Sequence, residues 1–255
     1  MTLYIPDVTF AFEVNGRRFA SGWLLLRSSF LVALAILLVS PPPARAVPDK
    51  KPDVPCRIQV LGFSGGLALP RFMTVSSFEG IARSVRELGH PDVCVRSFPV
   101  LHSGKAHRWV RGNFPPRTGD RLTDEELARG PRVILYGYSV GAKSALALAR
   151  KLEKEGIPVE LALLIDSTGR GEAVVPRNVR VAVHFYQKKT WLWPFRSDPK
   201  IRADDESDTI FLGNRRLDVG HFSIAGHPDV IDLLLSSITQ LRASSAFASL
   251  PPSAP

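Results

Sequence analysis

Residues 132–155 constrain the fold more than any other part of the chain. Residues 132–136 form a short apolar run of strand length, and residues 142–155 place alanine and leucine at helical spacing. Between them stands the G-x-S-x-G pattern of residues 137–141. A chain that passes from strand to helix in so few residues needs glycines around the serine to relieve crowding. The segment therefore predicts a strand, a strained turn that exposes the Ser139 hydroxyl, and a helix.

The rest of the chain repeats this alternation of short apolar runs and helical patterns. Such alternation is typical of parallel strands joined by crossover helices. We expect an α/β fold with a mostly parallel central sheet and helices on both faces. The predicted strands are residues 57–63, 92–98, 132–136, 161–165, 178–186 and 209–212. The predicted helices are residues 78–88 with a cap at Ser76 or Ser77, 123–130 with a Thr123/Glu126 capping box, 142–155, and 228–241, whereas residues 101–121 are expected to be irregular.

The first 46 residues are not ordinary domain sequence. Arginines precede an apolar run of about ten residues, and a small-x-small tripeptide ends at Ala46, as in a secretory signal. Counted from Trp23, the run also approaches the length of an uncleaved membrane anchor. Both interpretations predict export, to the periplasm or the medium. We expect residues 47–55 to be a linker, residues 56–242 the folded domain and residues 243–255 a disordered tail.

The net charge limits the classes of partner, and the two cysteines raise the question of a disulfide. The formal net charge is +9, but the basic residues are scattered and no nucleic-acid-binding module is present, so we expect no nucleic-acid partner. The excess charge is compatible with association with an anionic membrane surface. Cys56 and Cys94 begin two strands that we expect to be neighbours, and either a disulfide or two buried thiols fits that position.

With its strand, turn and helix in this order, the chain resembles the α/β-hydrolases, and it is most similar to their thioesterase-like members. The resemblance covers most of residues 56–242. It implies that Ser139 is a nucleophile and that an acid and a histidine follow it in that order. His221 is the best candidate for the base, because it follows the last strand and precedes the closing helix, and Gly220-His221-Phe222 resembles the thioesterase version.

The acid has two candidate locations. Asp166 follows five consecutive apolar residues, so its carboxylate should lie at the carboxyl end of a strand, where such folds bind ligands. The more common location in the family is after the following strand, where Asp204 and Asp208 stand in a long loop. We prefer Asp166 and keep both loop aspartates as alternatives.

The oxyanion hole and the substrate contacts complete the predicted site. Val140, which follows the nucleophile, is expected to supply one backbone N–H, and Phe63 the other, by similarity of residues 61–66 to the family's H-G-x-x-G loop. Leu61 departs from the histidine often found in that loop. We expect substrate contacts from Tyr138, Trp191 and Trp193.

The sequence thus favours an exported serine hydrolase that cleaves an ester or a thioester through an acyl-enzyme intermediate. The substrate is expected to be a small or lipid-like acyl compound, with an ester preferred because export separates the chain from coenzyme A thioesters. No metal and no organic cofactor is expected. The alternatives are a catalytically inactive binding protein of the same fold and a peptidase of the same fold. The sequence does not indicate the oligomeric state.

Overall fold

The computed structural model describes residues 55–65, 71–116, 119–168, 174–187 and 201–248, together with strands β1 (Glu13–Val14) and β2 (Arg17–Arg18). The chain divides into two compact units, Met1–Lys51 and Pro52–Pro255. In the first unit, β1 and β2 pair antiparallel. The predicted signal or anchor lies otherwise outside the described residues, as does nearly all of the linker. No helix among the described residues is long and apolar enough to cross a membrane.

The second unit is built on a sheet of six parallel strands, which confirms the predicted fold class. The strand order is β10-β8-β6-β5-β3-β4, with every neighbouring pair parallel. The strands are β3 (Ile58–Phe63), β4 (Val93–Phe98), β5 (Arg132–Tyr138), β6 (Val159–Ile165), β8 (Val179–Gln187) and β10 (Ile210–Leu217). Strands β7 (Val174–Val175) and β9 (Arg202–Ala203) form a separate two-stranded pair.

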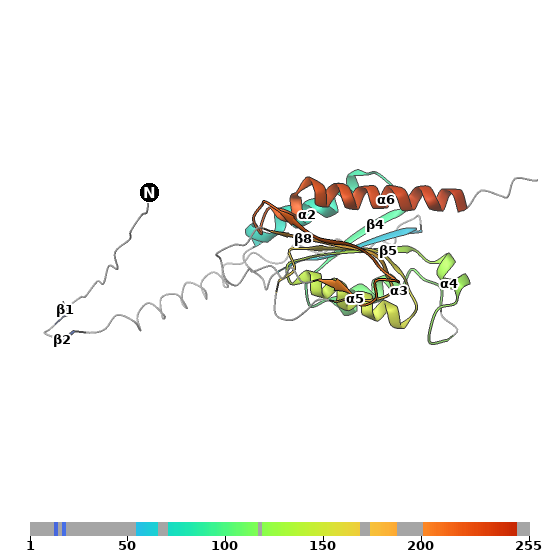
Figure 1. The fold of residues 1–255 in the computed structure, drawn as a ribbon, viewed down its shortest axis with the longest axis horizontal. Coiled ribbons are helices and arrows are strands. Elements are labelled where there is room, and N and C mark those ends of the chain that lie inside the picture. The colour runs from blue at the N-terminus through green and yellow to red at the C-terminus, as the bar shows by residue number, and fades with distance from the viewer. Residues whose placement is uncertain are drawn as a thin grey trace, which may run out of the picture. The chain divides into compact units, whose positions relative to one another are not determined.

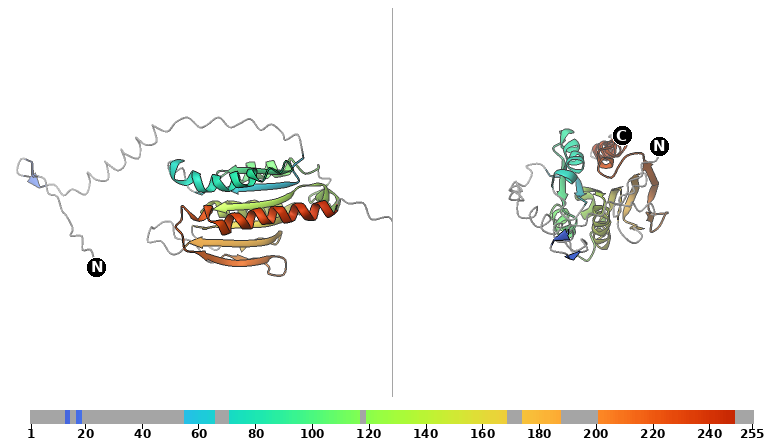
Figure 2. Two further views of the ribbon diagram at one scale, coloured as in Figure 1. Left: turned by 90° about the horizontal axis from the view of Figure 1, so that it is seen from above. Right: turned by 90° about the vertical axis from the view of Figure 1, so that its left-hand side faces the viewer.

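Helices cover both faces of this sheet, as Figures 1 and 2 show. Helices α3 (Ser103–Arg111) and α5 (Gly141–Lys154) lie on one face, and α2 (Arg71–Glu87) and α6 (Pro228–Ala248) lie on the other. The short α4 (Asp124–Arg129) and the 3-10 helix η1 (Ile224–Gly226) lie in connections. Successive residues of a strand point to opposite faces of the sheet and so pack in different layers. Leu61 and Leu135 face α3 and α5, while Val60 and Ile134 face α2 and α6.

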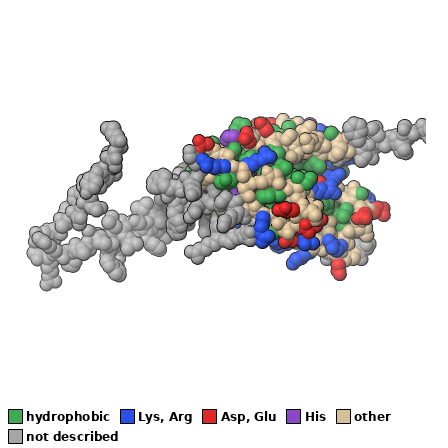
Figure 3. All heavy atoms as spheres, viewed as in Figure 1, with side chains coloured by type: hydrophobic (Ala, Val, Ile, Leu, Met, Phe, Trp, Pro, Cys, Tyr) green, Lys and Arg blue, Asp and Glu red, His purple; other side chains and the backbone are tan. Residues whose placement is uncertain are grey.

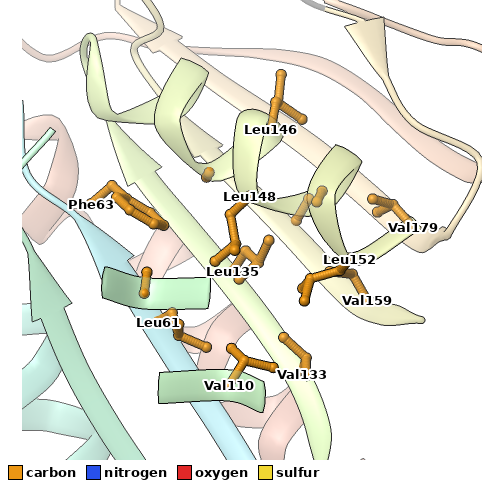
Figure 4. Close-up of a cluster of buried hydrophobic side chains, with 14 of the residues drawn as sticks. Leu61, Phe63, Val110, Val133, Leu135, Leu146, Leu148, Leu152, Val159 and Val179 are labelled. Carbon is orange, nitrogen blue, oxygen red and sulfur yellow. The ribbon is translucent and has the colours of Figure 1, made fainter. Parts of the chain in front are cut away.

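The layer between the sheet and α5 is largely apolar. In Figure 4, Leu148 of α5 lies beside Leu135 of β5, and both belong to the same buried cluster as Leu152 of α5 and Val133 of β5. All four side chains are fully buried. Each such side chain adds about 1.5–3 kcal/mol by leaving water, so this layer is a principal source of the free energy that holds β5 and the start of α5 in place.

The structure corrects several predicted boundaries. Residues 103–111, expected to be irregular, form α3, because Ala106 and Val110 recur at helical spacing and are buried against the sheet. Helix α2 begins at Arg71 rather than at Ser76 or Ser77. Helix α6 continues to Ala248, past the predicted domain end at 242, since alanine-rich sequence sustains a helix. The predicted tail is therefore wrong for residues 243–248, and residues 249–255 lie outside the described residues.

One local prediction is confirmed in detail, and one question that the sequence left open is answered. The Thr123 hydroxyl accepts the Glu126 N–H at 3.2 Å, and the Glu126 carboxylate accepts the Thr123 N–H at 2.8 Å, so the capping box is present. Cys56 and Cys94 form a disulfide with a Cα–Cα distance of 5.6 Å. The sequence left this pairing open, and the parallel register of β3 and β4 brings the two residues together.

The surface charge is mixed where it can be seen. Figure 3 shows Lys and Arg side chains interspersed with Asp and Glu on the face of the second unit that it displays. Among the described residues, the buried Glu160 carboxylate pairs with Arg132 at 2.5 Å and with Arg180 at 3.2 Å. The net positive charge is thus distributed over that face and gathers in no single patch there.

Candidate active site

The turn after β5 holds Ser139 in the left-handed region. Its φ is 57°, a strained value for a residue other than glycine. The next residues enter α5 at once, and this is possible only because Gly141 has no side chain: a Cβ there would lie 2.1 Å from the Phe63 carbonyl oxygen. A Cβ on Gly65 would lie 2.6 Å from the Ser139 Cβ. The loop after β3 therefore packs directly against the predicted nucleophile.

A second strained residue, Asp166, ends β6 beside this turn. Its φ is 47°, and its side chain is completely buried. One carboxylate oxygen, Oδ2, makes a short hydrogen bond with His221 Nδ1. The other, Oδ1, accepts the Gln187 N–H at 3.2 Å. Because a carboxylate only accepts, His221 Nδ1 carries the proton in this bond, and Nε2 is then the acceptor whenever the imidazole is neutral.

Tyr138, the residue that precedes Ser139, holds His221 in place. The Tyr138 hydroxyl donates to the His221 carbonyl oxygen at 2.7 Å, and the two rings are stacked with centroids 4.9 Å apart. Burial raises the pKa of Tyr138, with the nearby Asp166 charge adding to the shift, so the phenol stays protonated as a donor. Tyr138 thus couples the backbone of the predicted base to the turn that carries Ser139.

The hydrogen bond of the Ser139 side chain goes to a residue that the sequence did not single out. Ser139 Oγ and Thr168 Oγ1 are 3.0 Å apart, and both side chains are buried. Within the described part of the chain, no hydrogen bond joins Ser139 Oγ to His221. In unliganded enzymes the hydrogen bond between nucleophile and base is often long or poorly aligned, and it tightens when substrate binds.

A fully buried histidine supports the segment that carries Asp166 and Thr168. His184 Nε2 accepts the Ser167 N–H at 3.2 Å, which leaves Nδ1 to donate to Asn214 Oδ1 at 2.9 Å. The Asn214 amide in turn donates to the Ile201 carbonyl at 3.0 Å. This chain of hydrogen bonds fixes the neutral Nδ1–H form of His184 and holds the backbone between Asp166 and Thr168.

The predicted oxyanion donors lie at the same edge of the sheet. Among the described residues no acceptor is bonded to the Val140 N–H, which follows the nucleophile directly. Phe63 ends β3 in register with Phe98 and Gly137. The next N–H, that of Ser64, is already used by the Phe98 carbonyl at 3.1 Å. The roles of Phe63 and Val140 stay predictions.

The remaining predicted residues separate into three groups. Tyr138, expected to contact substrate, has a buried ring and a hydroxyl occupied by His221, so its observed part is support of the histidine. Trp191 and Trp193 lie outside the described residues. Of the alternative acids, Asp204 contacts Arg177 at 3.4 Å and Asp208 is exposed, whereas Asp166 is the one bonded to His221. The described residues hold no cluster of three or more potential metal-ligating side chains.

Sequence comparison adds no relative: no family model and no curated protein matches this chain. Solved structures similar in shape include RedJ, a thioesterase from the prodiginine biosynthetic pathway in Streptomyces coelicolor, at 15% identity, with 78% of this chain and 96% of that chain covered and a TM-score of 0.41. The type II thioesterase BorB from the borrelidin biosynthetic cluster is 12% identical over 74% of this chain and 95% of that chain, with a TM-score of 0.42. Human thioesterase 2 is 10% identical over 77% and 99%, with a TM-score of 0.41.

Likeness at this level is too remote to decide a substrate or a mechanism. The assignment of the fold rests on the chain's own features: the six parallel strands, the helices on both faces, the strained serine between β5 and α5, and the Asp166–His221 pair at the carboxyl edge. This arrangement is the α/β-hydrolase fold.

Proposed function

We propose that this protein is a serine hydrolase that cleaves an ester or a thioester through an acyl-enzyme intermediate. The observation that carries the proposal is the buried Asp166–His221 hydrogen bond beside a serine held in a left-handed turn. A buried carboxylate on Nδ1 orients the imidazole and stabilises the positive charge that the ring acquires when it takes a proton. Two residues of this arrangement have a strained backbone conformation, and strain of that kind concentrates at functional sites.

The proposed reaction has two halves. Ser139 Oγ attacks the carbonyl carbon of the substrate while its proton passes to His221 Nε2, and the carbonyl oxygen becomes an oxyanion that accepts the Val140 and Phe63 N–H groups. The bond to the leaving alcohol or thiol then breaks, and His221 returns the proton to that group. Water, deprotonated by His221, attacks the acyl-serine, and the acid is released as Oγ recovers its proton.

An apolar substrate is favoured by the surroundings of the base. Phe222, the residue after His221, is 37% exposed, and its ring lies edge-on to the imidazole with centroids 5.4 Å apart. An exposed aromatic ring beside the base offers a contact for an acyl chain or for an apolar alcohol. We also propose that Trp191 and Trp193 contact the substrate, and that an ester is the preferred substrate.

We further propose that the folded domain acts outside the cytoplasm, in the periplasm or the medium. The order of charge, apolar run and small residues in the first 46 residues supports export, with or without cleavage after Ala46. The Cys56–Cys94 disulfide also supports it, because disulfides persist mainly in oxidising compartments. Retention of the apolar run would leave the enzyme anchored to the membrane.

Labelling with a fluorophosphonate tests the proposal directly. The probe should label the purified wild-type protein, and Ser139→Ala should abolish the labelling because Oγ forms the bond to phosphorus. Ser236→Ala, a change at an exposed serine of α6, is the matched control and should label normally. A folded wild-type protein that is never labelled would instead support an inactive binding protein.

A substrate panel then separates the remaining alternatives. We expect turnover of p-nitrophenyl esters of several chain lengths and of matched thioesters, and little cleavage of peptides. A preference for peptide amides over esters by kcat/KM would support the peptidase of the same fold and would contradict the proposal.

A further inference from the structure

We propose that Thr168 is a further catalytic residue of this site, and that its hydroxyl donates a hydrogen bond to the reacting oxygen of Ser139. The inference rests on the proposed function, since it assigns Thr168 a role in the chemistry of the same serine. Thr168 Oγ1 lies 3.0 Å from Ser139 Oγ, and each side chain is only 5% exposed. A buried hydroxyl in contact with the nucleophile cannot be a solvated surface group.

The direction of the hydrogen bond follows from proton balance. A serine hydroxyl has one proton and two lone pairs, as does threonine, so either oxygen can donate in the resting enzyme. During attack the single proton of Ser139 must pass to His221 Nε2, which leaves Oγ as an acceptor. Thr168 Oγ1–H is then the donor, and the threonine keeps its own proton throughout.

This donor acts whenever charge gathers on Oγ. In deacylation the bond between the acyl carbon and Oγ breaks, the electron pair returns to Oγ, and the imidazolium of His221 supplies the proton. A hydrogen bond from Thr168 stabilises Oγ at that moment, as it does when Oγ loses its proton during attack. Such stabilisation is effective because the site is buried and the donor is already in place.

One short segment supplies both supporting contacts of the site. Asp166 holds His221, and Thr168, two residues later, holds Ser139. The residue between them is fixed by the bond from its N–H to His184 Nε2 at 3.2 Å. The hydroxyl is thereby preorganised, because the backbone that carries its short side chain is held by this bond.

Two substitutions separate the hydroxyl from the shape of the side chain. Thr168→Val keeps the volume and removes the donor, whereas Thr168→Ser keeps the donor and removes a methyl group. We expect Thr168→Val to lower both kcat for a p-nitrophenyl ester and the rate constant of fluorophosphonate labelling by about tenfold, with KM unchanged. Thr168→Ser should stay within about threefold of wild type, and circular dichroism with a thermal melt should report folded protein for both.

The outcomes are distinguishable. Wild-type rates in Thr168→Val would overturn the inference, and so would equal losses in Thr168→Val and Thr168→Ser, which would assign the effect to packing. A faster Thr168→Val would also overturn it, because the hydroxyl would then be holding Ser139 away from the base. In all three cases labelling of the wild-type protein leaves the hydrolase proposal standing, whereas a wild-type protein that is never labelled overturns both.

Discussion

Two regions of the molecule are equally buried but are built from different groups. One is the layer between β5 and α5, and the other is the carboxyl edge of the same sheet. Leu135 and Leu148 in the layer and Asp166 and His184 at the edge all have side chains with no exposed area. In the layer, burial itself provides the stabilisation, about 25 cal/mol per Å² of apolar surface. At the edge each buried polar group costs free energy unless it is hydrogen-bonded. Positions in the layer should therefore control stability, and positions at the edge should control activity.

The largest effect is expected at the edge, for Asp166→Asn. Asp166 accepts from His221 Nδ1 through one oxygen and from the Gln187 N–H through the other, whereas an amide has only one oxygen and carries no charge to stabilise the imidazolium, so kcat should fall by about 10³- to 10⁴-fold with KM little changed. Steady-state kinetics on an ester substrate measures this.

Two matched controls test the identity of the acid. Asp208→Asn and Asp204→Asn alter the loop aspartates that were the alternatives, and both should keep wild-type kcat. If Asp208→Asn lost activity and Asp166→Asn did not, the acid would be the loop residue, and the Asp166–His221 bond would be structural.

The layer should give the opposite result. Leu148→Ala removes a fully buried side chain from the face of α5 that packs on the sheet, and it should lower the free energy of unfolding by about 2–5 kcal/mol. Its kcat, measured well below the unfolding temperature, should stay near the wild-type value. Leu101→Ala, at a leucine that is 82% exposed, is the control and should leave stability unchanged. Loss of kcat in folded Leu148→Ala would break the division between layer and edge.

The sequence predicted the strands, α5 and the turn at Ser139, but it did not predict α3 or the supporting contacts of the edge, for physical reasons. Apolar periodicity is a repeated signal, so the parallel strands and α5 could be recognised from their residues alone. The turn at Ser139 could be recognised too, because close packing against Phe63 and Gly65 demands glycines at fixed places in the chain. The amphipathic α3 was missed although Ala106 and Val110 carried the same signal, since surrounding Gly, Pro and Arg obscured it.

The supporting contacts of the site carry no such signal. Thr168 becomes a neighbour of Ser139 through the register of β5 and β6, and the His184–Asn214 pair reaches the site through the register of β6, β8 and β10. Thr168 does belong to a polar run that directly follows the apolar residues of β6, and that run was the one available clue. His184 in a strand gives no indication of its role, because a lone buried histidine is equally compatible with simple packing.

His184→Leu tests how far the edge depends on this support. Leucine fills much of the same space but removes the hydrogen bonds that His184 makes with the Ser167 N–H and the Asn214 side chain. This loss should lower the free energy of unfolding by about 2 kcal/mol. Because the segment that bears Asp166 and Thr168 loses its fixed position, kcat should fall as well. Chemical denaturation and ester kinetics on the same sample measure both. A stability loss with unchanged kcat would show that the chain of hydrogen bonds is structural only.

The smallest expected effect lies at Gln59, a polar residue in this otherwise largely apolar layer. Its side chain is fully buried on the side of β3 that faces α3 and α5, and among the described residues neither its amide nitrogen nor its oxygen has a hydrogen-bond partner. Gln59→Leu should therefore raise the free energy of unfolding by about 1 kcal/mol, because it removes an uncompensated desolvation cost and adds apolar contacts. Denaturant titration compares it with Gln240→Leu at an exposed position of α6, which should change little. A destabilised Gln59→Leu would mean that the amide is bonded in solution, and that even this layer contains a polar contact on which the fold depends.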